Sequence, residues 1–191
     1  MKIISPRLTT QNRIKQWKTV FFILFLVFQT GNVFARGGKS DVKQNDTLVF
    51  ENQYQLNKYL IENKQFVLKA DYLQSWGYRR YVNSTINFVK VDSTTAVIQI
   101  GSDYRLGANG VGGVTAKGQI NRWKVRENPK SESFTIDISV MTPIGIYFLM
   151  FNIYSTGHST ALLTGLSAGQ LTFEGDIVPI SESNVFEGTS L

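Results

Sequence analysis

Cysteine is absent from this 191-residue chain, and histidine occurs once, at His158. Without cysteine the protein cannot form a disulfide, carry a lipid on an N-terminal cysteine or use a thiol as nucleophile. A transition-metal site usually gathers several nitrogen or sulfur ligands, so one histidine among scattered carboxylates does not predict one. We therefore expect no metal, no cofactor, and stability that comes from an ordinary hydrophobic core.

Long apolar runs are missing too. The longest, residues 19–28 (TVFFILFLVF), is about ten residues, whereas a helix that crosses a membrane needs about twenty. Five basic residues and no acidic one precede this run, and QTGNVFA follows it, which is the order of a secretory signal. We predict a signal peptide over residues 1–35 cut after Ala35, no transmembrane span after cleavage, and a periplasmic or outer-envelope location.

Little net charge is left without this leader. Its five basic residues lower the formal net charge from +6 to +1 when they are removed. A strongly basic protein would favour a nucleic-acid partner, because phosphate neutralisation supplies most non-specific affinity. We expect no nucleic-acid partner for the remaining residues, which are enough for one domain.

The remainder divides into a linker and one domain. Residues 36–47 (RGGKSDVKQNDT) are polar and predict a flexible linker. Apolar residues then recur at partial three-to-four spacing, which predicts a helix over 48–63, capped by Asp46 or Thr47. We expect residues 48–191 to form a single β-rich domain with this helix at its N-terminal side.

Period-two alternation dominates after the helix. In residues 133–140 (SFTIDISV) every second side chain is apolar, as in a half-buried strand. The same kind of segment occurs at 66–72, 86–91, 96–101, 118–126, 146–154, 160–164 and 171–177. About eight short strands joined by turns predict a mainly β fold, an antiparallel meander that forms a lipocalin-like barrel or a sandwich.

The strand at 145–154 (GIYFLMFNIY) is apolar on both faces, so something is expected to cover its outer side. We favour the helix at 48–63 as that cover, and a second subunit is the alternative. The protein is accordingly expected to be a monomer or a weak homodimer.

The loop RLGANGVGGVTAKG, residues 105–118, is rich in glycine. It has neither the dinucleotide-binding spacing nor the P-loop spacing, and no helix is predicted after it. We interpret it chiefly as a wide turn with positive φ at several glycines. The other interpretation places Asn109 and Gly110 at a barrel mouth in contact with a ligand.

Aromatic and basic residues alternate in LQSWGYRRYVNS, residues 73–84. Aromatic faces beside guanidinium groups stack on sugars or planar ligands and attract carboxylates or phosphates. The structural alternative is a strand connection whose aromatics close one end of the core. The candidate ligand-binding residues of this segment are Trp76, Tyr78, Arg79, Arg80 and Tyr81.

Catalytic constellations are sparse. His158 sits in a predicted turn, and the chain has no nucleophile elbow of the Gly-x-Ser-x-Gly kind. Glu174 and Asp176 share one face of the last strand and could act as an acid–base pair, but their alternation with apolar residues predicts a solvent face. We assign no catalytic residue and expect a protein that is not an enzyme.

Four stretches resemble domain-of-unknown-function family 4251, small exported proteins of certain Gram-negative bacteria: residues 66–72, 86–101, 107–125 and 171–188. The resemblance covers nearly all of the predicted domain and implies export and a single domain. It brings no catalytic or binding residues. Two tripeptides, DTL at 46–48 and DST at 92–94, look like acceptors for O-glycosylation in such bacteria, which makes Thr47 and Ser93 candidates.

Together these features favour a non-catalytic exported binding module for an amphipathic or apolar small ligand. An interaction module that meets another envelope protein is the alternative. A glycan or peptide hydrolase is a distant third, because no set of acid, base and nucleophile can be assembled.

Overall fold

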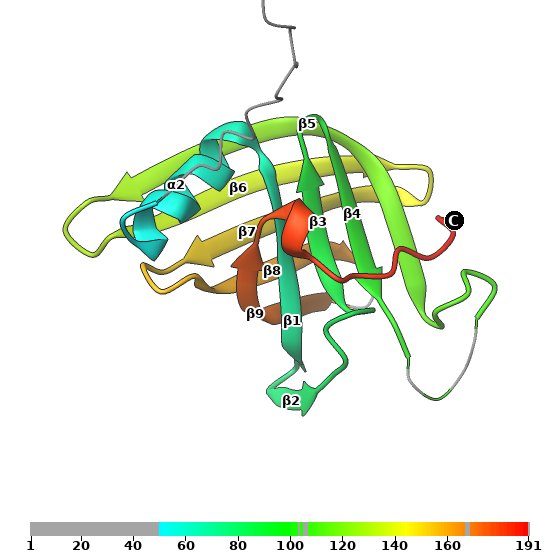
Figure 1. The fold of residues 1–191 in the computed structure, drawn as a ribbon. Helices are drawn as coiled ribbons and strands as arrows, with labels where there is room; N and C mark the ends of the chain where they lie inside the picture. Colours follow the sequence, from blue (N-terminus) through cyan, green and yellow to red (C-terminus); the bar gives the residue numbers. More distant parts are fainter. Residues whose placement is uncertain (1–49, 103, 105–106, 167–168, 191) are drawn as a thin grey trace, which may run out of the picture. The chain divides into compact units, whose positions relative to one another are not determined.

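Antiparallel strands close into a barrel in the computed structural model, which describes residues 50–102, 104, 107–166 and 169–190 (Figure 1). Within them nine strands form one sheet in the order β2-β1-β3-β4-β5-β6-β7-β8-β9, and β1 also pairs with β9. The eight barrel strands are β1 (Gln65–Ser75), β3 (Phe88–Asp92), β4 (Thr95–Ile100), β5 (Val114–Asn128), β6 (Ser133–Thr142), β7 (Gly145–Ile153), β8 (His158–Leu166) and β9 (Gly169–Val178). The predicted signal peptide, the linker and Thr47 lie outside the described residues.

Pairing of β1 with β9 closes the barrel and decides between the two predicted architectures. The ladder runs from Val67↔Val178 to Gln74↔Thr172. A Cβ atom at Gly175 would lie 1.9 Å from the carbonyl oxygen of Lys69, so the two backbones approach too closely there for a side chain. The mainly β barrel is thus confirmed, and the sandwich is not formed.

All eight predicted strands are present, with ends that differ by a few residues. The sequence analysis missed β2 (Tyr78–Tyr81), which pairs with the last residues of β1. It also missed a short 3₁₀ helix, η1 (Ile180–Glu182). Both are too short to produce a recognisable hydrophobic period.

The predicted helix exists but begins later than expected. Helix α2 spans Gln53–Asn63, and the Asn52 side chain caps it by accepting a hydrogen bond from the Gln55 amide at 2.9 Å. The start at residue 48 was wrong, because Asn52 has an extended backbone and makes the first-turn hydrogen bond itself. Lys64, in the left-handed conformation, ends the helix and returns the chain into β1.

Helix α2 lies against one end of the barrel and closes it (Figure 1). Leu60 and Ile61 are buried in the main core, and the buried Asn57 amide donates to the Tyr154 carbonyl at 3.0 Å. At the helix start, the Tyr54 ring stacks on Phe134 with centroids 5.3 Å apart. The Tyr54 hydroxyl and the Lys58 ammonium both bind the Glu127 carboxylate on β5. The hydrogen bond between Tyr54 and Glu127 raises the pKa of Tyr54 to about 12.

The barrel interior is largely filled by inward-facing side chains. Phe66 and Phe151 meet edge to face with centroids 5.6 Å apart, and Phe134 and Phe173 belong to the same buried cluster. Complete burial of such a side chain contributes about 1.5–3 kcal/mol. The interior therefore stabilises the fold and leaves little room for a ligand at its centre.

The outer side of β7 is not covered by the helix. Ile146, Phe148 and Met150 are all substantially exposed on the barrel surface. The predicted cover by residues 48–63 was wrong, because α2 instead packs across a barrel end, where Leu60 and Ile61 reach the interior core. Cover by a second subunit stays a prediction.

Candidate binding site at the barrel mouth

The antiparallel order gathers several connections at the barrel end away from α2, which we call the mouth (Figure 1). They include the β1–β2 hairpin, the β4–β5 loop, the β6–β7 turn and the β8–β9 hairpin. Both segments singled out in the sequence, residues 73–84 and the glycine-rich loop, thus belong to one end of the molecule. Mouths of small barrels are common places for ligands.

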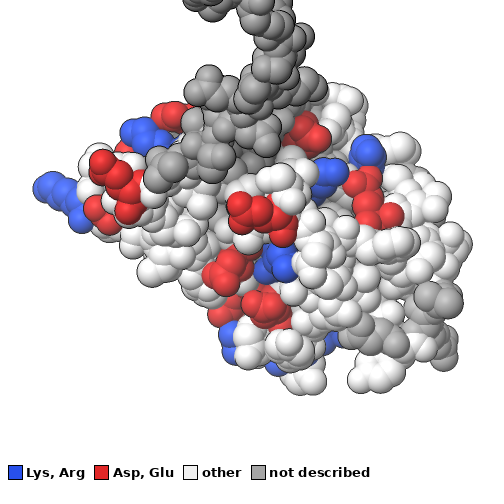
Figure 2. Space-filling view, in the orientation of Figure 1, with Lys and Arg blue, Asp and Glu red and all other residues white. Residues whose placement is uncertain are grey.

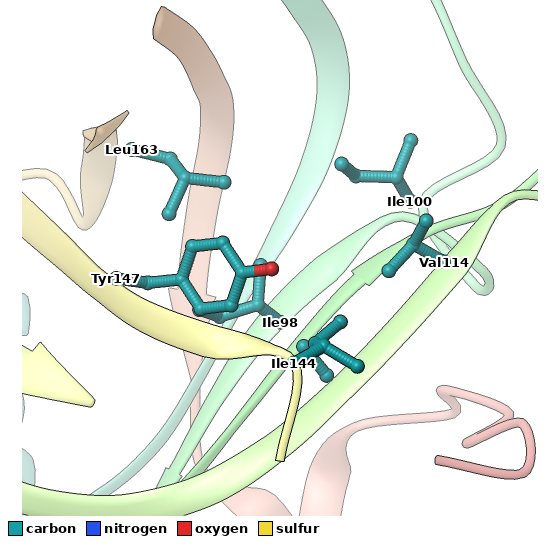
Figure 3. A pocket seen from close by; sticks show the side chains of 7 residues that line it. Ile98, Ile100, Val114, Ile144, Tyr147 and Leu163 are labelled. Atoms are coloured by element: carbon teal, nitrogen blue, oxygen red, sulfur yellow. The ribbon is translucent and has the colours of Figure 1, made fainter. Parts of the chain in front are cut away.

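A cavity of about 130 Å³ opens into the mouth. Its lining is apolar except for one hydroxyl and consists of Ile98, Ile100, Val114, Ala116, Ile144, Tyr147 and Leu163. Figure 3 shows the Tyr147 hydroxyl pointing into the space that these side chains surround. Among the described residues this hydroxyl has no hydrogen-bond partner, so it is available to a ligand.

Trp76 stands at the tip of the β1–β2 hairpin with an unusual backbone. Trp76 and Gly77 have φ values of 50° and 81°, so both central residues of the turn are left-handed. This conformation costs an L residue about 1 kcal/mol, yet the Trp76 side chain is 85 % exposed. The ring lies beside Gly169 and, with Thr164 and Gln170, lines a shallow groove of about 280 Å³.

The β1–β2 ladder divides the other four candidates between two faces. Arg80 is opposite Leu73 and Tyr78 is opposite Ser75, so both share the face on which Leu73 enters the core. Both side chains are exposed at the mouth. Tyr78 and Arg80, together with Trp76, are therefore the members of this segment best placed to meet a ligand there.

Arg79 and Tyr81 point to the outer surface. The Arg79 guanidinium lies 3.4 Å from the centroid of the Tyr72 ring and binds both carboxylate oxygens of Glu174. Tyr81 packs edge to face on Tyr72 with centroids 5.6 Å apart. Arg79 already has a carboxylate and an aromatic partner, so its visible role is to join β2 to β9.

The glycine-rich loop is a turn held by its own backbone. Gly110, Gly112 and Gly113 have positive φ, as predicted. The Gly110 amide donates to the Gly107 carbonyl, and the Val111 amide donates to the Asn109 side chain. These amides are satisfied within the loop and do not cradle a phosphate.

Asn109 and Gly110 have different surroundings within the glycine-rich loop. The Asn109 side chain is buried and donates to the Gly112 carbonyl and to the Thr115 hydroxyl, whereas Gly110 is exposed at the loop tip. The backbone oxygen of Asn109 accepts a hydrogen bond from the Thr189 amide. Thr189 belongs to the C-terminal segment, residues 179–190, which follows β9. The structure gives Asn109 an architectural role, and ligand contact at these two residues stays a prediction.

Gln99 fastens the C-terminal segment onto the outside of β3, β4 and β5. Its buried side chain donates to the carbonyls of Ile86 and Phe186 and accepts from the Thr115 hydroxyl and the Gly188 amide. Beneath this segment a second, small core forms from Val67, Phe88 and Val97, packed by Val178, Ile180 and Val185. Sequence analysis did not foresee this layer, because the C-terminal residues show no period.

The three groups with catalytic potential lie on the outer surface. His158 is the first residue of β8, with Nε2 3.7 Å from Glu174 and Nδ1 3.4 Å from Asp176. The hydrogen bonds from Arg79 lower the pKa of the Glu174 carboxyl, so this group is a stable anion near neutral pH. The predicted solvent face of Glu174 and Asp176 is confirmed, since both carboxylates lie beside His158 on the outside of β8 and β9.

Charge is mixed on the face drawn in Figure 2, where red and blue side chains are interspersed. Opposite charges also meet in ion pairs: Glu187 has Oε1 3.0 Å from Lys117 Nζ and Oε2 3.4 Å from Lys90 Nζ. Burial alone would raise the pKa of Glu187, but the two lysines outweigh it and lower the pKa. In the described part of the chain no group of three His, Asp or Glu residues is arranged to hold a metal.

Sequence reasoning missed the cavity residues themselves. Val114 was seen only as part of the glycine-rich loop and Tyr147 only as a strand residue, and Ile144 was not singled out. One signal was available, because Tyr147 falls on the inward phase of its strand near the strand end, where a phenol hydroxyl needs a partner or water.

No helix in the described ranges has the length and apolar character to cross a membrane.

Comparison with known proteins places these features in a family. The profile described as Domain of unknown function (DUF4251) matches residues 49–177. The fold is similar to the crystal structure of a DUF4251 family protein from Bacteroides eggerthii DSM 20697, with a TM-score of 0.59 and 24 % sequence identity. That match covers 70 % of this chain and 92 % of the other. No protein of curated function matches the chain.

Proposed function

This chain belongs to the DUF4251 family, and from that premise we propose that it is a non-catalytic binding module for a small amphipathic or apolar molecule. The observation that carries the proposal is the apolar mouth cavity with the single Tyr147 hydroxyl inside it. A mostly apolar pocket with few polar groups is the usual form of a small-molecule site.

The size of the cavity limits what enters it. With about 130 Å³ available and a filled barrel interior below, only a short apolar group fits inside. The remainder of the ligand stays at the mouth, where Tyr78, Arg80 and Trp76 are exposed. We propose that the ligand inserts the end of an alkyl chain and leaves its polar head near these side chains.

Binding without catalysis agrees with the surroundings of the titratable groups. Glu174 is held by Arg79 on the outer surface, so the cavity has only a tyrosine hydroxyl for chemistry. The order of residues 1–35 supports export to the periplasm or outer envelope. A small exported module that holds amphipathic molecules is the function that this combination favours.

A chain-length series tests the proposal. Hexanoate, octanoate and decanoate are titrated into the protein by calorimetry. Each methylene buried in the cavity contributes about 0.8 kcal/mol, so affinity is expected to rise about fourfold per buried methylene and to level off when the cavity is full. Absence of binding by all three probes contradicts the proposal.

Two matched variants locate the site. Val114 and Val125 lie on the same strand with 37 % and 38 % exposure, but only Val114 lines the cavity. Val114→Trp is expected to fill the opening and weaken decanoate binding at least about tenfold, whereas Val125→Trp leaves it unchanged. Equal binding by both variants, each with an unchanged thermal unfolding curve, would place the ligand elsewhere.

A further inference from the structure

An exposed apolar area covers the outside of β6 and β7. Its five members are 38–53 % exposed, and we call this set the β6–β7 face: Met141, Ile144, Ile146, Phe148 and Met150. The side chains lie on adjacent strands, since Met141 is paired with Ile146. Contiguous exposed apolar side chains of this kind mark interaction surfaces.

Basic residues border this face along β5. The strand registers place Arg122 opposite Ser139, which in turn is opposite Phe148, and they place Lys124 opposite Asp137, which is opposite Met150. Cross-strand partners share a face, so Arg122 and Lys124 project from the same outer surface as the apolar residues. Both are exposed, and within the described residues neither forms an ion pair.

We propose that the β6–β7 face docks onto an anionic lipid surface. The apolar side chains enter the boundary between headgroups and acyl chains, and Arg122 and Lys124 pair with lipid phosphates. Surface binding of this kind combines buried apolar area with attraction to anionic lipid. Both components are present side by side on this part of the barrel.

Charge favours lipid over a second copy of the chain. The carboxylate nearest to the two cations along the strands is Asp137, and it is already paired with Arg126 at 2.8 Å. On the other border, the outward residues of β8 opposite Met150 and Phe148 are Leu162 and Thr164, which carry no charge. A second copy would therefore bring cations and apolar groups to the contact, with no free carboxylate to meet Arg122 and Lys124.

The β6–β7 face is continuous with the mouth cavity through Ile144. This residue is 44 % exposed on the surface and also lines the cavity. Docking would hold the mouth beside the lipid, so that an alkyl chain could pass between bilayer and cavity. This last step rests on the proposed function, whereas docking itself does not require a filled cavity.

Vesicle flotation tests the docking. Protein is mixed with phosphatidylcholine vesicles, either pure or with about 30 % phosphatidylglycerol, and the bound fraction is measured. We expect binding to the anionic vesicles and much weaker binding to the neutral ones. Residues 1–49 are identical in every variant, so their own contribution is common to all of them.

Two pairs of variants separate the contributions. Phe148→Ser is expected to weaken binding to the anionic vesicles at least about tenfold, and its control, Phe186→Ser, removes another exposed phenylalanine without effect. Arg122→Glu with Lys124→Glu is expected to weaken binding at least about 25-fold, since each cation near the surface contributes about fivefold. Its control is Lys130→Glu in the β5–β6 turn.

Three outcomes overturn the docking proposal. They are equal binding by target and control variants, equal binding to neutral and anionic vesicles, and a dimer in sedimentation that Phe148→Ser dissociates. Val114→Trp distinguishes the two proposals, because it leaves the β6–β7 face intact. If Val114→Trp loses decanoate binding but still binds vesicles, both proposals are supported. If the wild type binds vesicles but does not bind decanoate, only the docking proposal is supported.

Discussion

Arg79 on β2 and Glu174 on β9 form a two-point ion pair across β1, with Nε to Oε2 at 2.9 Å and Nη2 to Oε1 at 2.8 Å. The arginine also lies on the Tyr72 ring of the strand between them. Arg79, which the sequence analysis named as a candidate ligand-binding residue, therefore joins three neighbouring strands.

This ion pair predicts a pH-dependent stability difference. The hydrogen bonds from Arg79 lower the pKa of Glu174 in the folded protein below its unfolded value of about 4.3. Its stabilisation is thus present above that value and is lost as the pH falls through the folded pKa. Glu174→Gln should unfold at lower urea concentration than the wild type near neutral pH, and the two should converge in acid.

Asp176→Asn is the matched control for this prediction. Asp176 lies two residues along β9, is largely exposed and has His158 Nδ1 at 3.4 Å. Its replacement should change the urea midpoint less than Glu174→Gln. A Glu174→Gln effect of the same size at acid and neutral pH would show that the ion pair is not its source.

Trp76→Asn is expected to stabilise the protein. Asparagine tolerates the left-handed conformation of the first turn position, and the exposed indole buries little surface, so the free energy of unfolding should rise by about 1 kcal/mol. Urea unfolding measures this change, and Tyr78→Asn, at a position without positive φ, should give no gain. A loss of stability in Trp76→Asn would mean that the contact with Gly169 outweighs the backbone strain.

Gln99→Leu should detach the C-terminal segment. Leucine leaves the carbonyls of Ile86 and Phe186 and the amide of Gly188 without their partner, which should lower the free energy of unfolding by about 3 kcal/mol. Limited proteolysis should then cut within residues 183–190. Gln119→Leu, an exposed change on β5, should stay within about 0.5 kcal/mol of the wild type and keep the segment protected.

Gly175→Ala tests the closure of the barrel. Its new methyl group would meet the Lys69 carbonyl, so we expect a loss of about 2 kcal/mol or more in the free energy of unfolding. Gly110→Ala has open space around it and only a positive φ to oppose it, so it should lose about 1 kcal/mol. A smaller loss at Gly175 than at Gly110 would argue against close contact between β1 and β9.

Much of the site could not be read from sequence. The aromatic–arginine segment and the glycine-rich loop were identified, and they do belong to one end of the barrel. The cavity was not found, because Ile98, Val114 and Tyr147 come from three strands whose meeting depends on the pairing order. The role of Arg79 was equally hidden, since its partner Glu174 lies 95 residues away along the chain.

The sequence by itself determined the eight strand segments and the phase of their alternation, because period two fixes which side chains share a face of each strand. It also determined the presence of a helix, though not its first turn, which depends on the Asn52 cap. Only the tertiary structure decided that β1 pairs with β9, that α2 closes an end and leaves β7 bare, and that an apolar cavity opens at the other end. The reason is that a local pattern states which face is apolar, whereas long-range pairing chooses what that face meets.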